Sequence, residues 1–583
     1  MVPQISQRTY INAMKKRLLV SLSFLALSCV FIREAHAEDH LLTILKSELN
    51  RETNQFKTSG EYAPYFISYR VDDIYESSAS ASFGSLYQKM TGTHVKTLTP
   101  MVRIGSYQMD SYREIAQKGM TSSSGAWRIP LDDEKGDATR MVLWKATRNA
   151  WDNGIQNLAD VKSKAQVRVE KEDKSDDFSK ELPAKYIEKE LTNAQLHVDS
   201  SLWEQRIKEY SAIFKEYPEI RTGEASFSFQ CCRKYYVSSE GTEITQNLTY
   251  CRVMVTAQVV ADDGMYLPLY LSYFAYEPKG LTAHETILKE TRELAETLVR
   301  LRTSPIVDSY TGPAILSPEA SGVFFHEIFG HRVEGQRLKS ESDGQTFKKK
   351  VGELVLPADV SVIMDPTIKS FGGLDLNGSY VYDDEGVKST KVDVVKDGIL
   401  KGFLMSRTPI EGFPSSNGHG RAAPGRDPVT RQSNLIISST APKTSAELRS
   451  ILKEEAKKQG KEYGYYFSKV SGGFTQTGRY NPNSFNVTPL EVYRVYVNGQ
   501  PDELVRGVTL IGTPLSMFAQ ISKVGDKAGI FTGMCGAESG SIPVTGISPE
   551  VYVNVVETQK AGKSDEKLPI LPRPESNQPK EAK

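Results

Sequence analysis

The stretch around which this chain is organised is Phe324-Phe325-His326-Glu327-Ile328-Phe329-Gly330-His331-Arg332-Val333-Glu334-Gly335. It places two imidazoles and two carboxylates within nine positions. Imidazole nitrogens bind zinc, and a glutamate that follows the first histidine is the general base of many zinc hydrolases. The stretch therefore predicts a metal site that carries its own base.

The residues before this stretch predict a helix. Ser317-Pro318-Glu319 offers a capping hydroxyl, a proline that needs no donor and an acid at the positive dipole end. In a helix from Ala320 to His331, the two histidines are five residues apart and point about 140° away from each other. We therefore expect a π-type turn, or unwinding near Gly330, that brings the rings together. In the alternative interpretation, both histidines are ordinary polar residues on a helix with a buried stripe of Ala320, Phe324 and Ile328.

The segment from His326 to His331 resembles the metal-binding segment of the TldD/PmbA metalloprotease family, whose pattern is His-Glu, three residues, His. Other segments resemble this family in the expected order: Gly312-Pro313, Asp383-Asp384-Glu385-Gly386, Asp397-Gly398-Ile399-Leu400-Lys401-Gly402, Gly418-His419-Gly420-Arg421, Arg431-Gln432-Ser433-Asn434, Gly507-Val508-Thr509-Leu510-Ile511-Gly512 and Gly533-Met534-Cys535-Gly536. The resemblance spans Tyr310 to Val556 and favours the metal interpretation.

The resemblance implies that a Cys535 thiolate joins His326 and His331 around one zinc ion per active subunit, with Glu327 as the general base. It further implies a peptidase that acts on unfolded or extended peptides inside a cavity between two subunits, one of which can lack the metal motif. Both a homodimer and a heterodimer with a related subunit are consistent with such a cavity. Glu334 remains a rival third ligand, because it follows His331 by three residues.

The competing functional class is a non-catalytic binding or assembly subunit of an exported complex that holds zinc structurally. A structural zinc site is closed by four protein ligands, whereas a catalytic site keeps one position open. The number of protein ligands therefore separates the two classes.

The loop from Gly418 to Asn434 is rich in glycine and arginine. The resemblance implies that it lies near the active cleft. Its histidine, His419, either contacts substrate there or is an ordinary solvated loop residue.

The N-terminus has the features of a targeting segment. Lys15-Lys16-Arg17 precedes an apolar run from Leu18 to Ile32, and Ala35-His36-Ala37 supplies small residues for a signal peptidase. We expect a signal peptide over residues 1–37 and a periplasmic or secreted mature chain. The apolar run is shorter than the ~20 residues of a membrane helix, so no stable membrane span is expected. The alternative is a lipoprotein anchored at Cys29.

The net charge of the chain gives no support to a nucleic-acid partner, and none is expected. Removing residues 1–37 changes 72 basic and 72 acidic residues to 67 and 71, a net charge of −4. Nucleic-acid binding depends on basic surface, so this balance gives it no support.

Export would place the cysteines in an oxidising compartment. Cys231 or Cys232 could then pair with Cys251, because both segments are rich in strand-forming residues. In the alternative, these cysteines are buried free thiols.

The predicted fold class is α+β. Residues 38–305 are expected to form a mixed domain, with strands at Tyr65–Val71 and Val253–Val260 and a helix that starts in a capping box at Thr282. Residues 306–558 are expected to form a mostly β metalloprotease domain, with the metal-binding helix at the junction and a second capping box at Thr444. Short apolar runs mark its strands: Val360 to Met364, Val392 to Val395, Val492 to Val497 and Val551 to Val556. Residues 559–583 are expected to be a disordered tail.

Overall fold

The computed structural model describes residues 39–113, 125–167, 173–340, 343, 345–475, 477–478 and 485–561. The predicted signal peptide lies outside these ranges, as do residues 562–583 of the predicted tail. No helix within them combines the length and the apolar character needed to cross a membrane.

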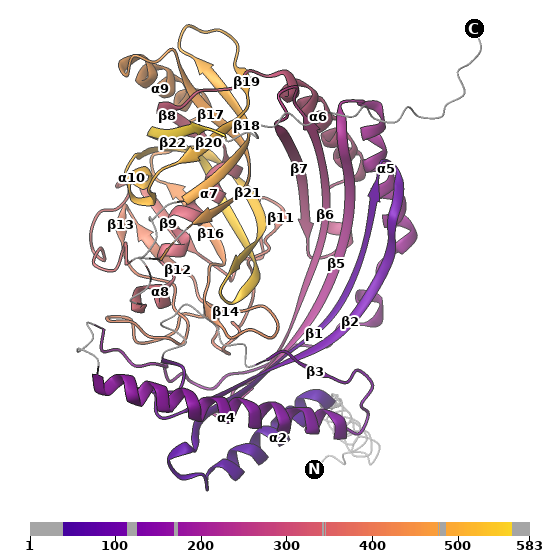
Figure 1. The fold of residues 1–583 in the computed structure, drawn as a ribbon, viewed down its shortest axis with the longest axis vertical. Coiled ribbons are helices and arrows are strands. Elements are labelled where there is room, and N and C mark those ends of the chain that lie inside the picture. The colour runs from indigo at the N-terminus through magenta and orange to yellow at the C-terminus, as the bar shows by residue number, and fades with distance from the viewer. Residues whose placement is uncertain are drawn as a thin grey trace, which may run out of the picture.

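The first half of the chain builds a seven-stranded sheet in the order β3-β2-β1-β5-β6-β4, with β7 beside β6. Its strands are β1 (Pro64–Ser82), β2 (Ser85–Ile104), β3 (Trp127–Ile129), β4 (Lys185–Ile187), β5 (Ile220–Ser238), β6 (Glu243–Val260) and β7 (Tyr266–Ala275). All pairs are antiparallel except β4 with β6. Figure 1 shows the long strands curving together as a wall beside the rest of the molecule.

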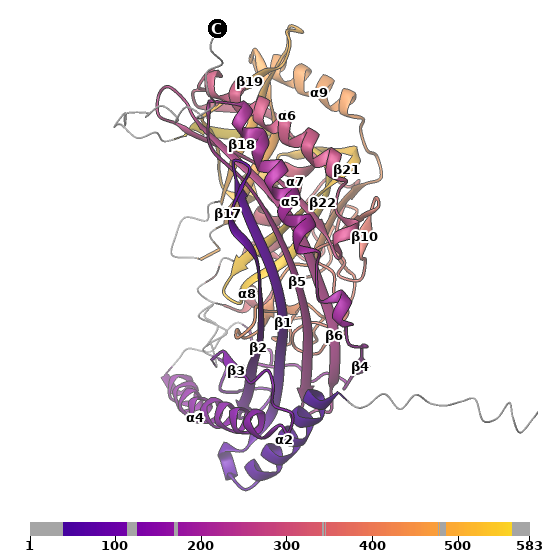
Figure 2. The ribbon, with the colours of Figure 1, turned by 90° about the vertical axis from the view of Figure 1, so that its right-hand side faces the viewer.

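Helices cover one face and one end of this sheet. Helices α5 (Ser200–Ala212) and α6 (His284–Thr303) pack on its outer face, where they share a core with β5, β6 and β7 (Figure 2). Helices α2 (His40–Phe56) and α4 (Asp137–Val167) cover the opposite end and share a second core with β1 and β2. The inner face is left to the second half of the chain.

The second half forms an eleven-stranded sheet in the order β13-β12-β9-β16-β22-β20-β18-β17-β8, with β19 beside β18 and β21 beside β22. Its strands are β8 (Tyr310–Leu316), β9 (Val360–Met364), β12 (Val392–Lys396), β13 (Ile399–Leu400), β16 (Asn434–Ser439), β17 (Tyr463–Thr475), β18 (Phe485–Tyr496), β19 (Glu503–Val505), β20 (Val508–Ile511), β21 (Ile521–Ala537) and β22 (Gly540–Lys560). An extra pairing of β22 with β8 closes five of these strands into a ring.

Short elements complete this half. Two ribbons pair β10 (Ser370–Phe371) with β11 (Leu374–Asp375), and β14 (Gly420–Arg421) with β15 (Val429–Thr430). The helices are α7 (Pro318–Ile328), α8 (Gly335–Lys339), α9 (Ser445–Lys458) and α10 (Pro514–Phe518). The apolar side chains of α7 enter the main core of this half, so the predicted metal-binding stretch sits on a rigid element.

The structure confirms the predicted α+β class, with a mixed first half and a mostly β second half. The capping box at Thr444 forms as predicted, because Thr444 and Glu447 bond each other's main-chain amides. The one predicted at Thr282 is wrong, since α6 begins one residue later and Ala283 takes the N-cap position. Strand β22 runs to Lys560, two residues into the range predicted as a tail, because Lys560 pairs with Val508.

Candidate metal centre and its cleft

Helix α7 starts where the sequence predicts. The Ser317 hydroxyl accepts a hydrogen bond of 3.1 Å from the amide of Ala320, and Pro318 occupies the first helical position. Ser317 also donates to the carbonyl oxygen of Ser468 at 2.7 Å, which joins the helix start to β17. The entry to the helix is therefore fixed by a cap and by the neighbouring strand.

The helix ends at Ile328, and a 3₁₀ turn at Gly330–Arg332 follows. This is the predicted unwinding near Gly330, and no π turn is needed. Its result is that the rings of His326 and His331 lie with centroids 4.9 Å apart. The two histidines therefore do not share one regular helix, contrary to the alternative in which both lie on a helix with a buried stripe.

Two side chains satisfy the carbonyl groups left open at this helix end. Gln432 donates to the carbonyl oxygen of His326 at 3.2 Å, and Arg332 donates to that of Glu327 at 2.8 Å. A Cβ atom at Gly330 would lie 1.9 Å from Oε1 of the buried Gln432. A Cβ at 330 would therefore displace the Gln432 amide from the carbonyl oxygen of His326.

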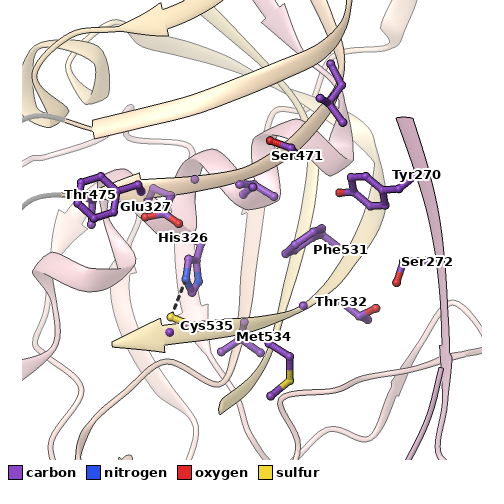
Figure 3. Close-up of a pocket in the computed structure, with 18 of the residues that line it drawn as sticks. Tyr270, Ser272, His326, Glu327, Ser471, Thr475, Phe531, Thr532, Met534 and Cys535 are labelled. Carbon is purple, nitrogen blue, oxygen red and sulfur yellow. Dashed lines mark hydrogen bonds between the residues drawn. The ribbon is translucent and has the colours of Figure 1, made fainter. Parts of the chain in front are cut away.

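Three atoms that can bind a metal converge at this turn. Cys535 Sγ lies 3.2 Å from His326 Nε2 and 3.4 Å from His331 Nε2, and all three atoms lie within 4.8 Å of one another. Figure 3 shows the His326 ring directed at the Cys535 sulfur. Nitrogen and sulfur ligands of one tetrahedral zinc ion lie ~3.5 Å apart. The donor set therefore fits zinc in both chemistry and spacing.

Cys535 is held by its own hairpin. It lies near the end of β21 and is buried with Ile542 and Val544 of β22. Arg431 donates to the carbonyl oxygen of Cys535 at 2.6 Å and to that of Gly540 at 2.9 Å. One buried guanidinium thus ties both arms of the hairpin together.

Glu334 lies behind His331 and outside the three-residue group. Its carboxylate accepts from His331 Nδ1 at 3.1 Å and from Arg337 Nε at 2.7 Å. Burial opposes ionisation of Glu334, but the charges of His331 and Arg337 lower its pKa to about 2. A carboxylate on Nδ1 leaves Nε2 of His331 facing the cysteine, as in histidine ligands with an oriented tautomer. The rival assignment of Glu334 as third ligand finds no support in this geometry.

Charges also prepare the cysteine for metal binding. Burial opposes ionisation of Cys535, but His331 and His326 hold the pKa of the thiol well below its usual range. Burial lowers the pKa of His331, but the charges of Glu334 and Cys535 outweigh it and raise that pKa to about 10. The thiolate is the form that binds metals, so the cluster stabilises the required state of Cys535.

Glu327 lies next to the donor group. The residue is 7% exposed and its side chain packs under β17, where a Cβ atom at Gly473 would lie 2.2 Å from Glu327 Cγ. The carboxylate lines the same cavity as His326 and Cys535 (Figure 3). The predicted base is therefore beside the predicted ligands.

A cavity of about 910 Å³ opens over this group and separates the two halves of the chain. One wall comes from β6 and β7, including Arg252 and Tyr270, and the other from α7, β17 and β21, including Phe531. The volume is in the range of sites that enclose small ligands. The donor atoms thus face a space large enough for a short peptide segment.

His419 has neither of its predicted roles. It is fully buried, and its ring bonds Asn417 Oδ1 at 3.0 Å and Ser433 Oγ at 3.2 Å. Burial lowers the pKa of His419 to about 3. It is therefore a neutral structural residue of its loop.

The predicted acidic turn is also structural. Asp384 accepts hydrogen bonds from Lys234 of β5 at 2.5 Å and from the amide of Ala422 at 2.9 Å. Asp383 accepts from the amide of Gly420 at 2.9 Å. The turn therefore fastens the arginine-rich loop to the first sheet.

Among the residues that the structure describes, the cysteines other than Cys535 are free and buried: Cys231, Cys232 and Cys251. Cys231 lies opposite Thr249 and Cys251 opposite Phe229, so the two thiols are not directly paired across the strands. Burial raises the pKa of Cys231 to about 12. The structure favours the free-thiol alternative.

Sequence reasoning missed the roles of Arg431 and Gln432. Both belong to the segment Arg431-Gln432-Ser433-Asn434 that resembles the family, yet nothing in the local pattern indicates that Arg431 holds Cys535 and Gln432 holds His326. Polar residues that lie in a short run before the buried strand β16 were the available signal.

Comparison with protein families gives one match in the second half of the chain. Residues 309–560 match the PmbA/TldA metallopeptidase C-terminal domain. A metalloprotease of Methanocaldococcus jannaschii is 29% identical over 330 residues, which are 56% of this chain and 67% of the relative. A zinc metalloprotease TldD homologue of Saccharolobus solfataricus is 27% identical over 244 residues, or 41% of this chain and 50% of the relative. The matches thus span about two thirds or less of these relatives.

Among solved structures, TldE from Thermococcus kodakarensis superposes with a TM-score of 0.59 and 15% identity. The likeness covers 89% of this chain and 100% of that one. It shows that both halves share the fold of that protein.

Proposed function

Since residues 309–560 belong to the PmbA/TldD metallopeptidase family, we propose that this protein is a zinc-dependent peptidase of unfolded or extended peptides. The named relatives are metalloproteases, and one is a zinc metalloprotease. The proposal for the whole chain also draws on the geometry of its own residues.

The observation that carries the proposal is the group of His326, His331 and Cys535, whose donor atoms lie within 4.8 Å of one another beside a cavity. In the described part of the chain, no fourth histidine, cysteine or acid joins this group. Catalytic zinc sites have three protein ligands and one open position. This count favours a peptidase over a subunit with structural zinc.

Each residue has a defined task in this proposal. His326 and His331 each offer Nε2, and Cys535 offers its thiolate, to one zinc ion per active subunit. When bound, zinc supplies Lewis-acid polarisation of the peptide carbonyl and makes water more acidic. Glu327 takes a proton from the attacking water on its carboxylate and passes it to the leaving amine. Glu334 orients the ring of His331, and Arg431 orients Cys535.

The assembly and the location are further parts of the proposal. The fold shared with TldE is consistent with pairing to a related subunit, and a homodimer is the simpler arrangement. The basic, apolar and small-residue order over residues 1–37 supports export to the periplasm or beyond.

The deciding test compares zinc content and peptide cleavage for the unmutated protein, Glu327→Gln and Cys535→Ser. We expect Glu327→Gln to retain zinc and lose cleavage, since it removes only the base. Cys535→Ser should lose both. An unmutated protein that holds about one equivalent of zinc, closed by a fourth ligand, and cleaves no peptide would favour the structural-zinc subunit instead.

A further inference from the structure

Arg252 brings a positive charge into the cavity from the wall opposite the donor group. In β6 the residues alternate, so Cys251 and Val253 face the core shared with α5 and α6, whereas Arg252 and Met254 face the cavity. The position of the guanidinium is therefore set by the pleat of the strand.

Two hydrogen bonds hold this guanidinium in place. Nη1 donates to Ser272 Oγ at 2.5 Å and to the carbonyl oxygen of Thr532 at 3.2 Å. Figure 3 shows Thr532 on the strand that carries Cys535, with Ser272 on the facing wall. Arg252 thus joins the two walls of the cavity. Both of these hydrogen bonds come from Nη1, and neither involves Nε or Nη2.

Arg252 has no carboxylate partner among the residues that the structure describes. Burial lowers the pKa of its guanidinium, and only Tyr270 acts in the other direction. The other arginine that lines the cavity, Arg337, is paired with Glu334 and Glu538. A half-buried cation without a counter-charge, held at the wall of a cavity, is suited to an anionic ligand.

The contact of Arg252 with Thr532 also sets the distance between the guanidinium group and the donor group. Thr532 precedes Cys535 by three residues on β21, or ~10 Å along the strand. An extended peptide covers that length with about three residues.

We propose that Arg252 binds a carboxylate of the substrate about three residues from the bond that is cleaved. The carboxylate is either the free C-terminus of the peptide or an acidic side chain. The guanidinium group donates hydrogen bonds to the two carboxylate oxygens, while Ser272 and Thr532 fix the orientation of the guanidinium group. Arg252 is then a specificity-determining residue, and this assignment rests on the proposed peptidase function.

The test uses three peptides of equal length: one with a free C-terminus, its C-terminal amide, and the amide with a glutamate placed three residues after the cleaved bond. Cleavage is followed by mass spectrometry, and binding is measured by fluorescence anisotropy with Glu327→Gln. The variants are Arg252→Gln and Arg252→Lys, with Arg300→Gln on the exposed face of α6 as the matched control.

We expect unmutated protein to favour the free acid over the amide by about 10- to 100-fold in kcat/KM, as for a charge-assisted hydrogen bond. Arg252→Gln should reduce this ratio to within about twofold, and Arg252→Lys should keep part of it. Arg300→Gln should leave it unchanged. If the glutamate restores cleavage of the amide in an Arg252-dependent way, the side chain is the source of the carboxylate.

The ratio between peptides does not depend on the fraction of folded protein, so a partly unfolded variant still gives an answer. If unmutated protein and Arg252→Gln show the same ratios, the assignment is overturned while the peptidase function stands. If no peptide is cleaved, the peptidase function fails, and the anisotropy ratios still decide whether Arg252 binds a carboxylate.

Discussion

Arg431 donates a hydrogen bond of 2.6 Å from Nη2 to the main-chain carbonyl oxygen of Cys535. The two residues are 104 positions apart in the sequence, and both are buried. The position of the thiol therefore depends on a side chain that cannot itself bind the metal. Residues of this kind are testable apart from the ligands.

Arg431→Lys should lower zinc affinity by about 10- to 100-fold, as for other losses of a partner behind a metal ligand. Lysine keeps the charge but cannot reach Ser539, Gly540 and Cys535 together with one planar group. Competition with a zinc-binding dye measures the change. Arg426→Lys, exposed in the same loop, is the control. Equal affinities for the two variants would contradict the role of Arg431.

Glu334→Gln and Cys535→Ser should differ in zinc content. Cys535→Ser should lose the metal, whereas Glu334→Gln should keep it with an affinity lowered by about 10- to 100-fold, because only the partner of His331 is lost. Glu538→Gln removes another carboxylate from Arg337 without touching His331 and serves as the control. Zinc retention by Cys535→Ser together with loss from Glu334→Gln would instead make Glu334 the third ligand.

Gly330→Ala should destabilise the protein by about 1–3 kcal/mol, the usual cost of overpacking a core. The added methyl would meet the Gln432 amide. Replacing Gln432 by alanine in the same chain should recover part of the loss, because it vacates that space. Urea unfolding measures both variants. Gly92→Ala, in an exposed position with no neighbour closer than 3.8 Å, should change little, and an equal loss there would count against steric exclusion at Gly330.

His419 should make the protein less stable in acid. Burial lowers its pKa from 6.5 to about 3 in the folded protein, so between these values only the unfolded chain takes up the proton. Stability from this residue is complete above pH 6.5 and falls as pH drops toward 3, with a slope of up to about 1.4 kcal/mol per pH unit.

Urea unfolding of His419→Gln across this range should show a flatter pH dependence than the unmutated protein. His197→Gln, at an exposed position, is the control. Parallel curves for the unmutated protein and His419→Gln would show that His419 titrates normally.

Expression in a bacterium with an export pathway should yield a mature chain that starts near Glu38, because Ala35-His36-Ala37 precedes it. Mass spectrometry of the purified protein identifies the first residue of the mature chain. A chain that retains residues 1–37 in the cytoplasm would contradict the export proposal, whereas a lipid-modified Cys29 would favour the lipoprotein alternative.

Local pattern was enough to predict several elements. Ser317-Pro318-Glu319 starts α7, Thr444 and Glu447 cap α9, and the apolar runs at Val360–Met364 and Val392–Val395 lie in β9 and β12. These signals lie within a few residues of the structure that they specify. The same reasoning failed at Thr282, because a one-residue shift of the helix start removes a cap without changing the apolar pattern.

The sequence by itself determined the chemistry of the candidate site: two histidines, a glutamate between them and a cysteine flanked by glycines. The family resemblance pointed to Cys535 as the partner of His326 and His331, and the tertiary structure brings the three together. Tertiary structure alone decided that Glu334 lies behind them and that His419 is buried. The physical reason is distance along the chain. Residue types and short-range periodicity specify helices and turns, whereas contacts over a hundred or more residues depend on how β21, β22 and α7 pack into one core.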